Sequence, residues 1–221
     1  MKKKYLIQRD YKDVFRAFLL KDAQIVGEWD IPFVRASERV PNQLVPFDKF
    51  KVGSDRDKWV HFYIHDYHFE RVWNRPQYYL EKLKHCQGVI STDFSLYTNM
   101  PLAQQLWNTY RNRALANWFQ RNGIEVIPNV RWGDEKSYTF CFDGIEPGKT
   151  VAIGTHGCIK KKQDKLEFQR GLEVMLERLY PQTIIVYGSA PEKLFHSCIQ
   201  SGISLVRFDS LFHISRQRDG G

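Results

Sequence analysis

Short apolar runs alternate with amphipathic helical segments along most of this chain, and that alternation restricts the fold more than any other feature. The clearest pair begins with the strand-like run GVIST (88–92). A long helix follows, opened by Met100-Pro101 and ended near Asn122-Gly123. Continuous apolar runs such as TIIVYG (183–188) are typical of parallel strands, which are covered on both faces. We therefore expect an α/β fold with a largely parallel sheet and flanking helices.

Segments on both sides of that pair repeat the pattern. Further strands are predicted at residues 59–66, 124–130, 137–142, 150–155, 183–188 and 204–209, and short apolar runs bounded by prolines lie at 31–36 and 44–47. Further helices are predicted at 70–86, with an interruption or start near Pro76, at 164–179 and at 192–202. About eight strands permit a small or incomplete (β/α) barrel, although 221 residues are close to the lower limit of a full (β/α)8 barrel. An open sheet is equally admissible.

The chain has the size and composition of one folded domain. With 221 residues, 43% hydrophobic and 14% aromatic, it can bury a sizeable core, which excludes a largely disordered chain. We expect a single α/β domain over residues 1–221. Within it, residues 1–28 form a peripheral segment with a short helix, and residues 215–221 form a frayed tail.

Charge and cysteine usage restrict the partners and the compartment. The net charge of +8 favours anionic partners such as nucleotides, nucleic acid or acidic surfaces. Four widely spaced cysteines without a CxxC pair are typical of reduced thiols. The sequence has neither the apolar region of a secretory signal nor a run long enough to span a membrane. We therefore expect a cytoplasmic protein.

Polar side chains follow several expected strands, at the carboxyl ends where α/β proteins bind ligands. Asp93 stands at one such end beside Ser95, and Arg131 and His156 stand at others. A carboxylate there can bind a metal, act as a general base or hold a ribose hydroxyl. Asp and Ser also commonly cap a turn or helix without any ligand. We take Asp93 as the candidate catalytic residue and Ser95 as a candidate ligand contact.

The long central helix carries amide and guanidinium groups on one face. Asn108, Arg111 and Asn112 are spaced at i, i+3 and i+4, and Arg113 is adjacent. Arginine is suited to bidentate recognition of phosphate, and a buried arginine needs an anionic partner, which Asp93 or a ligand could supply. The alternative is an ordinary solvated helix face. Asn108, Arg111 and Arg113 are candidate ligand contacts.

Two glycine-containing turns, GTHG (154–157) and GSAPE (188–192), each follow an apolar strand and precede a helical segment. Such turns can offer backbone N–H groups to an anion, although ordinary strand-to-helix turns have the same composition. Neither turn matches a P-loop or a dinucleotide-binding fingerprint. Thr155, Gly157 and Ser189 are the candidate anion contacts in these turns. Trp132, at another strand end, is a candidate for stacking on a base or sugar.

Histidines in HFYIHDYH (61–68) raise the possibility of a metal site. On a strand, His61 and His65 would share one face, and with Asp93 and His156 they could form a mixed His/carboxylate site. No HExxH motif is present, and surface histidines in an aromatic strand need no metal, so we assign no metal ligand. No GxSxG motif or activated cysteine indicates nucleophilic catalysis, and the sequence indicates no particular cofactor.

Small and polar residues recur at fixed spacing through the central third of the chain. They form D-x-S-x-Y at 93–97, a proline at 101, N-x-x-R-x-R at 108–113, VIP-x-x-x-W at 126–132 and FDGI at 142–145. In these residues the chain resembles the domain-of-unknown-function family number 4417 of phages, prophages and mobile elements. The resemblance implies one defined domain in a mobile-element setting, and it brings no activity with it.

Three functional hypotheses remain open. The first is a cytoplasmic phage or mobile-element protein that binds a small phosphorylated ligand, such as a nucleotide, at the strand ends, with hydrolysis as a further step. The second is a basic nucleic-acid-binding accessory protein that uses the lysine clusters at 2–4 and 160–162. The third is a protein-interaction module that blocks a host factor through an exposed aromatic patch. Whether the protein is an enzyme, and its oligomeric state, are not decided by the sequence.

Overall fold

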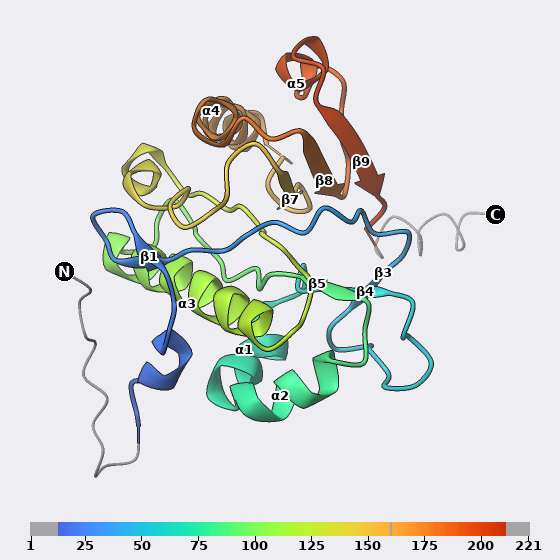
Figure 1. Ribbon diagram of the computed structural model, residues 1–221. Helices are drawn as coiled ribbons and strands as arrows, with labels where there is room; N and C mark the ends of the chain where they lie inside the picture. Colours follow the sequence, from blue (N-terminus) through green and yellow to red (C-terminus); the bar gives the residue numbers. More distant parts are fainter. Residues whose placement is uncertain (1–12, 160, 211–221) are drawn as a thin grey trace.

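The structure, a computed structural model, describes residues 13–159 and 161–210 and has a mixed α/β fold (Figure 1). The helices are η1 (Ala17–Leu20), α1 (Asp66–Asn74), α2 (Pro76–Leu83), α3 (Leu102–Arg121), η2 (Glu135–Thr139), α4 (Lys162–Leu179) and α5 (His196–Gln200), of which η1 and η2 are 3-10 helices. The strands are β1 (Ile25–Val26), β2 (Ile31–Pro32), β3 (Leu44–Pro46), β4 (Trp59–His61), β5 (Gly88–Ile90), β6 (Val126–Ile127), β7 (Thr150–Gly154), β8 (Thr183–Tyr187) and β9 (Ser204–Phe208).

Two parallel sheets form the centre of the fold. Strands β3, β4, β5 and β6 make a four-stranded parallel sheet, and β7, β8 and β9 make a three-stranded parallel sheet, each in sequence order. A parallel bridge between Asn129 and Ala152 joins the chain after β6 to β7. Strands β1 and β2 form a separate antiparallel pair. The expected parallel sheet with flanking helices is confirmed, and the strands of the described residues do not close into a barrel.

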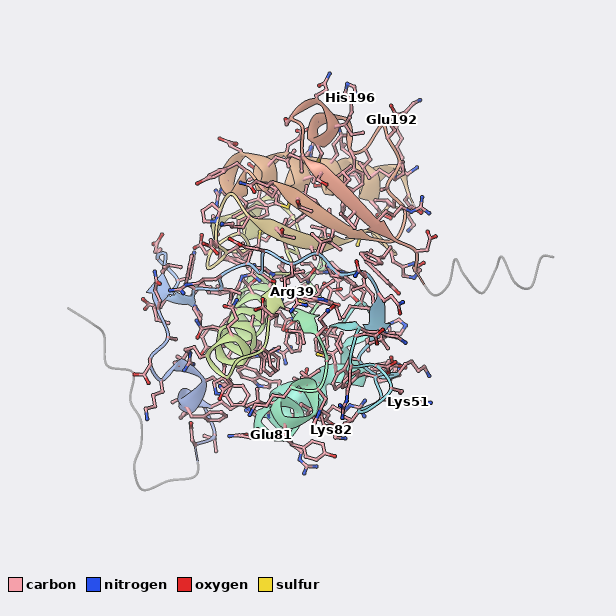
Figure 2. The ribbon with its side chains drawn as sticks, turned by 45° about the vertical axis from the view of Figure 1, so that its right-hand side comes forward. Arg39, Lys51, Glu81, Lys82, Glu192 and His196 are labelled. Carbon is pink, nitrogen blue, oxygen red and sulfur yellow. The ribbon has the colours of Figure 1, made fainter. Side chains whose placement is uncertain are left out.

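The helices lie on the outside of this arrangement. Figure 1 shows α1, α2 and α3 beside the four-stranded sheet and α4 and α5 beside the three-stranded one. In Figure 2, Lys51 and Lys82 lie at one end of the molecule and His196 at the other, with their side chains directed outward. Parallel strands joined by helical crossovers are covered in this way, which is why the strand sequences are continuously apolar.

One apolar layer is shared by both sheets. It is made of five fully buried side chains, one from each of the strands β4 to β8: Trp59, Ile90, Ile127, Ala152 and Ile185. The Trp59 ring fits because β5 begins with a glycine, since a Cβ atom on Gly88 would lie 2.5 Å from that ring. The two sheets therefore curve around a common interior, and their carboxyl ends open on the same side.

The strongest sequence patterns predicted their elements well. The helix after Met100-Pro101 is α3, the predicted 164–179 helix is α4, and Pro76 separates α1 from α2 at a first-turn position. The apolar runs at 150–155, 183–188 and 204–209 are β7, β8 and β9. These elements have long, regular apolar periodicity, which is the most dependable signal in a sequence.

Several predicted strands are wrong in extent or kind, and the one predicted at 124–130 is formed only at β6 (Val126–Ile127). The strand predicted at 59–66 ends at His61, and Asp66 already begins α1. The segment 137–142 is a 3-10 helix followed by turns, not a strand. There, the Ser137 hydroxyl accepts a hydrogen bond from the Gly133 N–H at 3.0 Å and donates one to the Asp134 carbonyl at 2.6 Å. Such local side-chain bonds stabilise turns over extended chain.

Several expectations fall outside what the structure describes. The frayed tail at 215–221, residues 1–12 of the peripheral segment with the lysines at 2–4, and Lys160 lie beyond the described residues, whereas the short helix expected in the peripheral segment is the 3-10 helix η1. The single-domain assignment stays a prediction. Among the described residues, no helix is both long and apolar enough to cross a membrane.

Candidate functional site

Three strand ends meet at Asp93, which follows β5 and is buried. The Asn129 amide donates to Asp93 Oδ1 at 2.8 Å, and Arg131 Nη1 donates to Oδ2 at 3.0 Å, both from the chain after β6. The Tyr63 hydroxyl, from the chain after β4, donates to Asn129 Oδ1 at 2.9 Å. These four side chains form one continuous polar network at the carboxyl ends of the four-stranded sheet.

Burial and neighbouring charges shift the pKa values of Asp93 and Arg131 in opposite directions. Burial raises the pKa of the Asp93 carboxyl, while the Arg131 charge and the Asn129 hydrogen bond oppose that rise. Burial alone would lower the pKa of Arg131, but the charges of Asp93, Cys158, Tyr97 and Asp66 together outweigh it and raise that pKa. Burial also raises the pKa of Tyr63 well above its usual value, so Tyr63 stays a neutral donor. Asp93 and Arg131 therefore form a charged pair in a weakly solvated place.

The pair is open on the side of Arg131. The Arg131 side chain is 20% exposed, and the neighbouring Tyr97 is 54% exposed. Tyr97, Cys158 and Asp66 lie close enough to Arg131 for their charges to act on its pKa. Arg131 Nε is buried and has no hydrogen-bond partner within the described chain. An unpaired buried N–H is costly, and in a polar site it indicates a position for a water or ligand atom.

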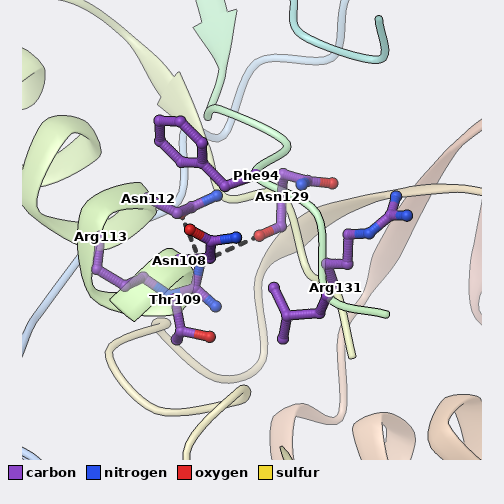
Figure 3. Close-up of a pocket in the computed structure, with 8 residues that line it drawn as sticks. Phe94, Asn108, Thr109, Asn112, Arg113, Asn129 and Arg131 are labelled. Atoms are coloured by element: carbon purple, nitrogen blue, oxygen red, sulfur yellow. Dashed lines mark hydrogen bonds between the residues drawn. The ribbon is translucent and has the colours of Figure 1, made fainter. Parts of the chain in front are cut away.

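A very small cavity lies between α3 and this network (Figure 3). It is lined by Phe94, Leu96, Asn108, Thr109, Asn112, Arg113, Asn129 and Arg131. Its volume of about 10 Å³ admits one water molecule at most. Figure 3 shows the Arg131 guanidinium pointing away from the α3 side chains. A ligand larger than water must therefore reach Arg131 from the side opposite to α3.

Arg111 is held by α1. Its Nη1 donates to both carboxylate oxygens of Glu70, at 2.7 and 2.8 Å, and its Nη2 donates to Asn108 Oδ1 at 2.6 Å. The guanidinium also lies over the Phe94 ring, 3.8 Å from its centroid. The anionic partner that this buried arginine requires is thus Glu70, whereas Asp93 pairs with Arg131.

Arg113 is almost completely buried and is bound to backbone. Its guanidinium donates to four acceptors: the carbonyls of Asp143 (3.1 Å), Asn129 (3.1 Å) and Cys141 (2.9 Å) and the Asn112 side-chain oxygen (2.6 Å). Burial lowers its pKa to about 10. These bonds attach α3 to the chain after β6, so Arg113 holds the backbone that carries Asn129.

Ser95 and Asn108 hold the loop that carries Asp93. The backbone N–H and the hydroxyl of Ser95 donate to the Asp66 carboxylate at 3.0 and 2.8 Å. The Asn108 amide donates to the Ser95 carbonyl at 2.7 Å. The Asp66 carboxylate at the start of α1 thus fixes the position of the chain two residues after Asp93.

The remaining candidates lie at the ends of β7 and β8 and in the core. The Thr155 hydroxyl donates to the Ser189 carbonyl at 2.7 Å, while the Ser189 side chain and Gly157 are exposed. Gly157 has φ +83°, a conformation that favours glycine. Trp132 is buried, with its ring centroid 5.1 Å from that of Phe168, so its indole belongs to the core beside α4.

The histidines do not share a face. His65 lies outside the strand and precedes α1, whereas His61 is buried on β4 and its Nδ1 accepts the Tyr63 N–H at 3.2 Å. Burial lowers the pKa of His61 to about 3, so it is neutral. Within the described ranges, no cluster of three or more His, Cys, Asp and Glu side chains could hold a metal ion.

The sequence analysis did not select Tyr63 or Asn129 as candidates, and it assigned no partner to Arg131. A pattern in the sequence does point to these three residues. Residues two apart on a strand share a face. Asn129 and Arg131 continue at this spacing from Ile127 of the shared apolar layer, and Tyr63 is four residues after Trp59 of the same layer. The interior face therefore turns from apolar to polar where each strand ends.

Comparison with known proteins identifies relatives but no activity. A family model described as "Domain of unknown function (DUF4417)" matches residues 23–208. The "Gene 1 protein" of Mycobacterium phage L5 is 38% identical over 163 residues, which are 72% of this chain and 71% of that protein. The "Gene 1 protein" of Mycobacterium phage D29 is 35% identical over 163 residues, 72% of this chain and 60% of that protein. No solved structure matches the chain. These relatives support the phage setting expected from the sequence.

Proposed function

The chain belongs to the DUF4417 family, a domain family of unknown function, and we propose from the geometry of the strand ends that the protein binds a small phosphorylated ligand such as a nucleotide. The ligand lies against Arg131 on the side of Tyr97 and of the turn that contains Gly157. Asp93 and Asn129 hold Arg131 in place for it.

The observation that carries this proposal is the Asp93–Arg131 pair. A buried ion pair is seldom needed for stability, since desolvation offsets much of its attraction. Here it stands at the carboxyl ends of parallel strands, where α/β proteins bind ligands. Asp93 occupies only Nη1 of Arg131, at 3.0 Å, and Nε has no partner in the described chain. A phosphate can therefore bind a second edge of the guanidinium while Asp93 keeps the first.

The neighbouring loops supply the remaining contacts of this proposal. The exposed backbone around Gly157 and Ser189 can donate N–H groups to further phosphate oxygens. Tyr97, 54% exposed and close to Arg131, is better placed than the buried Trp132 to stack on a base. Arg111 and Arg113 act by holding the site rather than by touching the ligand. Both Nη groups of Arg111 and the nitrogens of the Arg113 guanidinium already have protein acceptors, and among these donors only the buried Nε of Arg111 has none in the described chain.

Asp93 also gives the site a candidate general base. Burial raises its pKa towards the neutral range, which is the direction that general-base catalysis requires. Hydrolysis of a phosphate or glycosidic bond is the reaction that this arrangement suits, with Asp93 accepting the proton of the attacking water.

All four cysteines are free thiols, which suits a reducing compartment such as the cytoplasm.

Isothermal titration with inorganic phosphate, AMP and ATP tests this proposal. Arg131→Gln should weaken binding of the preferred probe at least tenfold. Arg207→Gln is the matched control, because Arg207 also pairs with an aspartate, Asp209, but on the surface at the end of β9. Its binding should equal that of the unmodified protein. Circular dichroism confirms folding of both variants, and phosphate release from ATP reports turnover.

Two results would overturn the proposal. One is the absence of binding to all three probes by the unmodified protein. The other is an Arg131→Gln variant that is folded and binds as tightly as the Arg207→Gln control.

A further inference from the structure

A cluster of exposed cations surrounds two tyrosines on α1 and α2. The Arg75 guanidinium lies 4.8 Å from the centroid of the Tyr78 ring, and the Lys82 ammonium lies 4.5 Å from it. Arg71 is 5.8 Å from the Tyr79 centroid. The three cations and Tyr78 are exposed. We call these five residues the α1–α2 surface.

The charge of this surface is not neutralised by nearby carboxylates. Within the described residues, Arg71, Arg75 and Lys82 take part in no ion pair, although acidic side chains are close in sequence. Glu81 pairs with Lys84 at 2.8 Å, and Glu70 is used by Arg111. Three positive charges in contact with aromatic rings therefore remain available to an anion.

The titration of Tyr78 agrees with a concentrated positive charge. A hydrogen bond with Lys82 lowers the pKa of the Tyr78 hydroxyl, and the charges of Lys82, Arg75 and Arg71 lower it further. A tyrosinate is favoured only where cations dominate the surroundings. The surface thus favours negative charge next to an exposed ring.

Exposed rings among cations provide the two contacts that a nucleic-acid single strand needs. Bases stack on aromatic side chains regardless of sequence, and phosphates pair with Lys and Arg. A base can displace one cation from the Tyr78 ring, and that cation then pairs with the adjacent phosphate. A duplex offers phosphates but keeps its bases stacked inside, so it cannot use the ring in this way.

We propose that the α1–α2 surface binds single-stranded nucleic acid, with phosphates on Arg71, Arg75 and Lys82 and a base on Tyr78. The net charge of +8 favours the same partner. Lys82 lies on the outside of α2 at one end of the molecule, where a long strand has access (Figure 2). This surface does not depend on Arg131, so the inference goes beyond the function proposed above.

The test is fluorescence polarisation with a labelled 20-nucleotide oligo-dT at increasing salt. Three phosphate contacts predict a slope of about −2 in a plot of log K against log salt concentration, at about −0.7 for each contact. Lys82→Gln should reduce the steepness by about 0.7, whereas Lys84→Gln should not, since Lys84 is paired with Glu81. Both changes remove one positive charge from the same end of α2.

A second pair of variants tests the stacking. Tyr78→Ala should weaken binding about tenfold, which is the usual scale for losing one base–aromatic stack. Tyr67→Ala is the control, because Tyr67 is 72% exposed on α1 and stacks on His65, and no cation is seen over its ring in the described structure. Binding by this control should be unchanged. Arg131→Gln should also bind oligo-dT normally, which separates this surface from the ligand site.

Three outcomes would overturn the inference. The first is the absence of oligo-dT binding at 50 mM salt by the unmodified protein. The second is equal loss in Lys82→Gln and Lys84→Gln, or in Tyr78→Ala and Tyr67→Ala, with all four folded by circular dichroism. The third is tighter binding of a duplex of the same length or of poly-glutamate, which would assign the surface to a duplex or an acidic protein.

Discussion

Arg131 and Asp93 face each other across two adjacent strand ends, with Nη1 and Oδ2 3.0 Å apart and with side chains only 20% and 10% exposed. The sequence separates them by 38 residues, and α3 lies between them in the chain. Parallel pairing of β5 with β6 is what brings them together. Because each is the other's counter-charge, neither can be removed without leaving a buried charge unpaired.

Replacing Arg131 by methionine should destabilise the fold by about 3 kcal/mol at neutral pH, because Asp93 then remains charged and buried. The loss should shrink as the pH falls. A buried carboxyl without its counter-ion has a folded pKa above its unfolded value of about 3.9. Its penalty is therefore complete above the folded pKa, shrinks as the pH falls below that value, and disappears below the unfolded pKa. Urea unfolding of the variant between pH 4 and pH 8 measures this.

A second substitution checks the cause of that loss. Asp93→Asn added to Arg131→Met removes the unpaired charge, so the double variant should be more stable at pH 8 than Arg131→Met alone. If the double variant is less stable, or if the loss in Arg131→Met does not depend on pH, the ion pair is not the source of the effect.

His61 should make the protein less stable as the pH falls, which is opposite to the pH dependence expected for the Arg131→Met loss. Its folded pKa of about 3 lies below the unfolded value of about 6.5. Below pH 6.5 the unfolded chain therefore takes up a proton that the folded chain does not, and the free energy of unfolding falls as the pH falls towards 3. The expected contribution is a loss of about 2 kcal/mol between pH 8 and pH 5.

His61→Asn isolates that contribution, because the asparagine oxygen can accept the Tyr63 N–H in place of Nδ1 but does not titrate. The difference in unfolding free energy between the unmodified protein and this variant should change by about 2 kcal/mol over the same pH range. A constant difference would mean that the imidazole is accessible to protons in the folded state.

A side chain at position 171 should destabilise the fold, although Gly171 lies inside α4. A Cβ atom there would stand 2.1 Å from Trp132 Nε1. Alanine favours helix by about 1 kcal/mol over glycine, but overpacking a core costs about 1–3 kcal/mol, so Gly171→Ala should lower stability by about 1 kcal/mol. Thermal unfolding measures the net loss. Because phenylalanine is smaller than tryptophan, Gly171→Ala should cost less in a Trp132→Phe background, and an equal cost there would exclude the clash.

Local patterns were enough to predict the elements with regular periodicity. The spacing of apolar residues on α3 and the uninterrupted run at β8 depend on neighbours in the chain, and both were predicted within a few residues. The run at 59–66 was misread because its aromatic residues continue past His61 while the backbone turns towards α1. Aromatic residues pack equally well in a strand, a turn or a helix.

Asp93 could be chosen as a candidate from the sequence, but its partners could not. It was chosen because it stands at the carboxyl end of an expected strand, where α/β proteins bind ligands. Its partner could not be deduced, since Arg111 and Arg131 are equally basic and only the fold places Glu70 against the first. Such pairs depend on contacts between residues 38 or 41 positions apart, which periodicity does not report.

Arg113 should be the arginine to which stability is most sensitive. It donates to the carbonyls of Asp143, Asn129 and Cys141 and to Asn112 Oδ1, and lysine can reach only some of these acceptors. Each buried acceptor left without a donor costs about 1–3 kcal/mol, so Arg113→Lys should lower the free energy of unfolding by about 3 kcal/mol or more.

The control lies on the same helix. Arg121 is exposed, and its guanidinium donates to the Leu19 carbonyl and to the Asn117 side-chain oxygen. Arg121→Lys keeps the charge as well, but water can reach the acceptors that it leaves, so its cost should stay below about 1 kcal/mol. Urea unfolding gives both values. Since Arg113 also holds the Asn129 backbone, Arg113→Lys should weaken the ligand binding proposed at Arg131 even where the variant is fully folded. If Arg113→Lys and Arg121→Lys are equally stable, the carbonyl contacts of Arg113 are not what attaches α3 to the chain after β6.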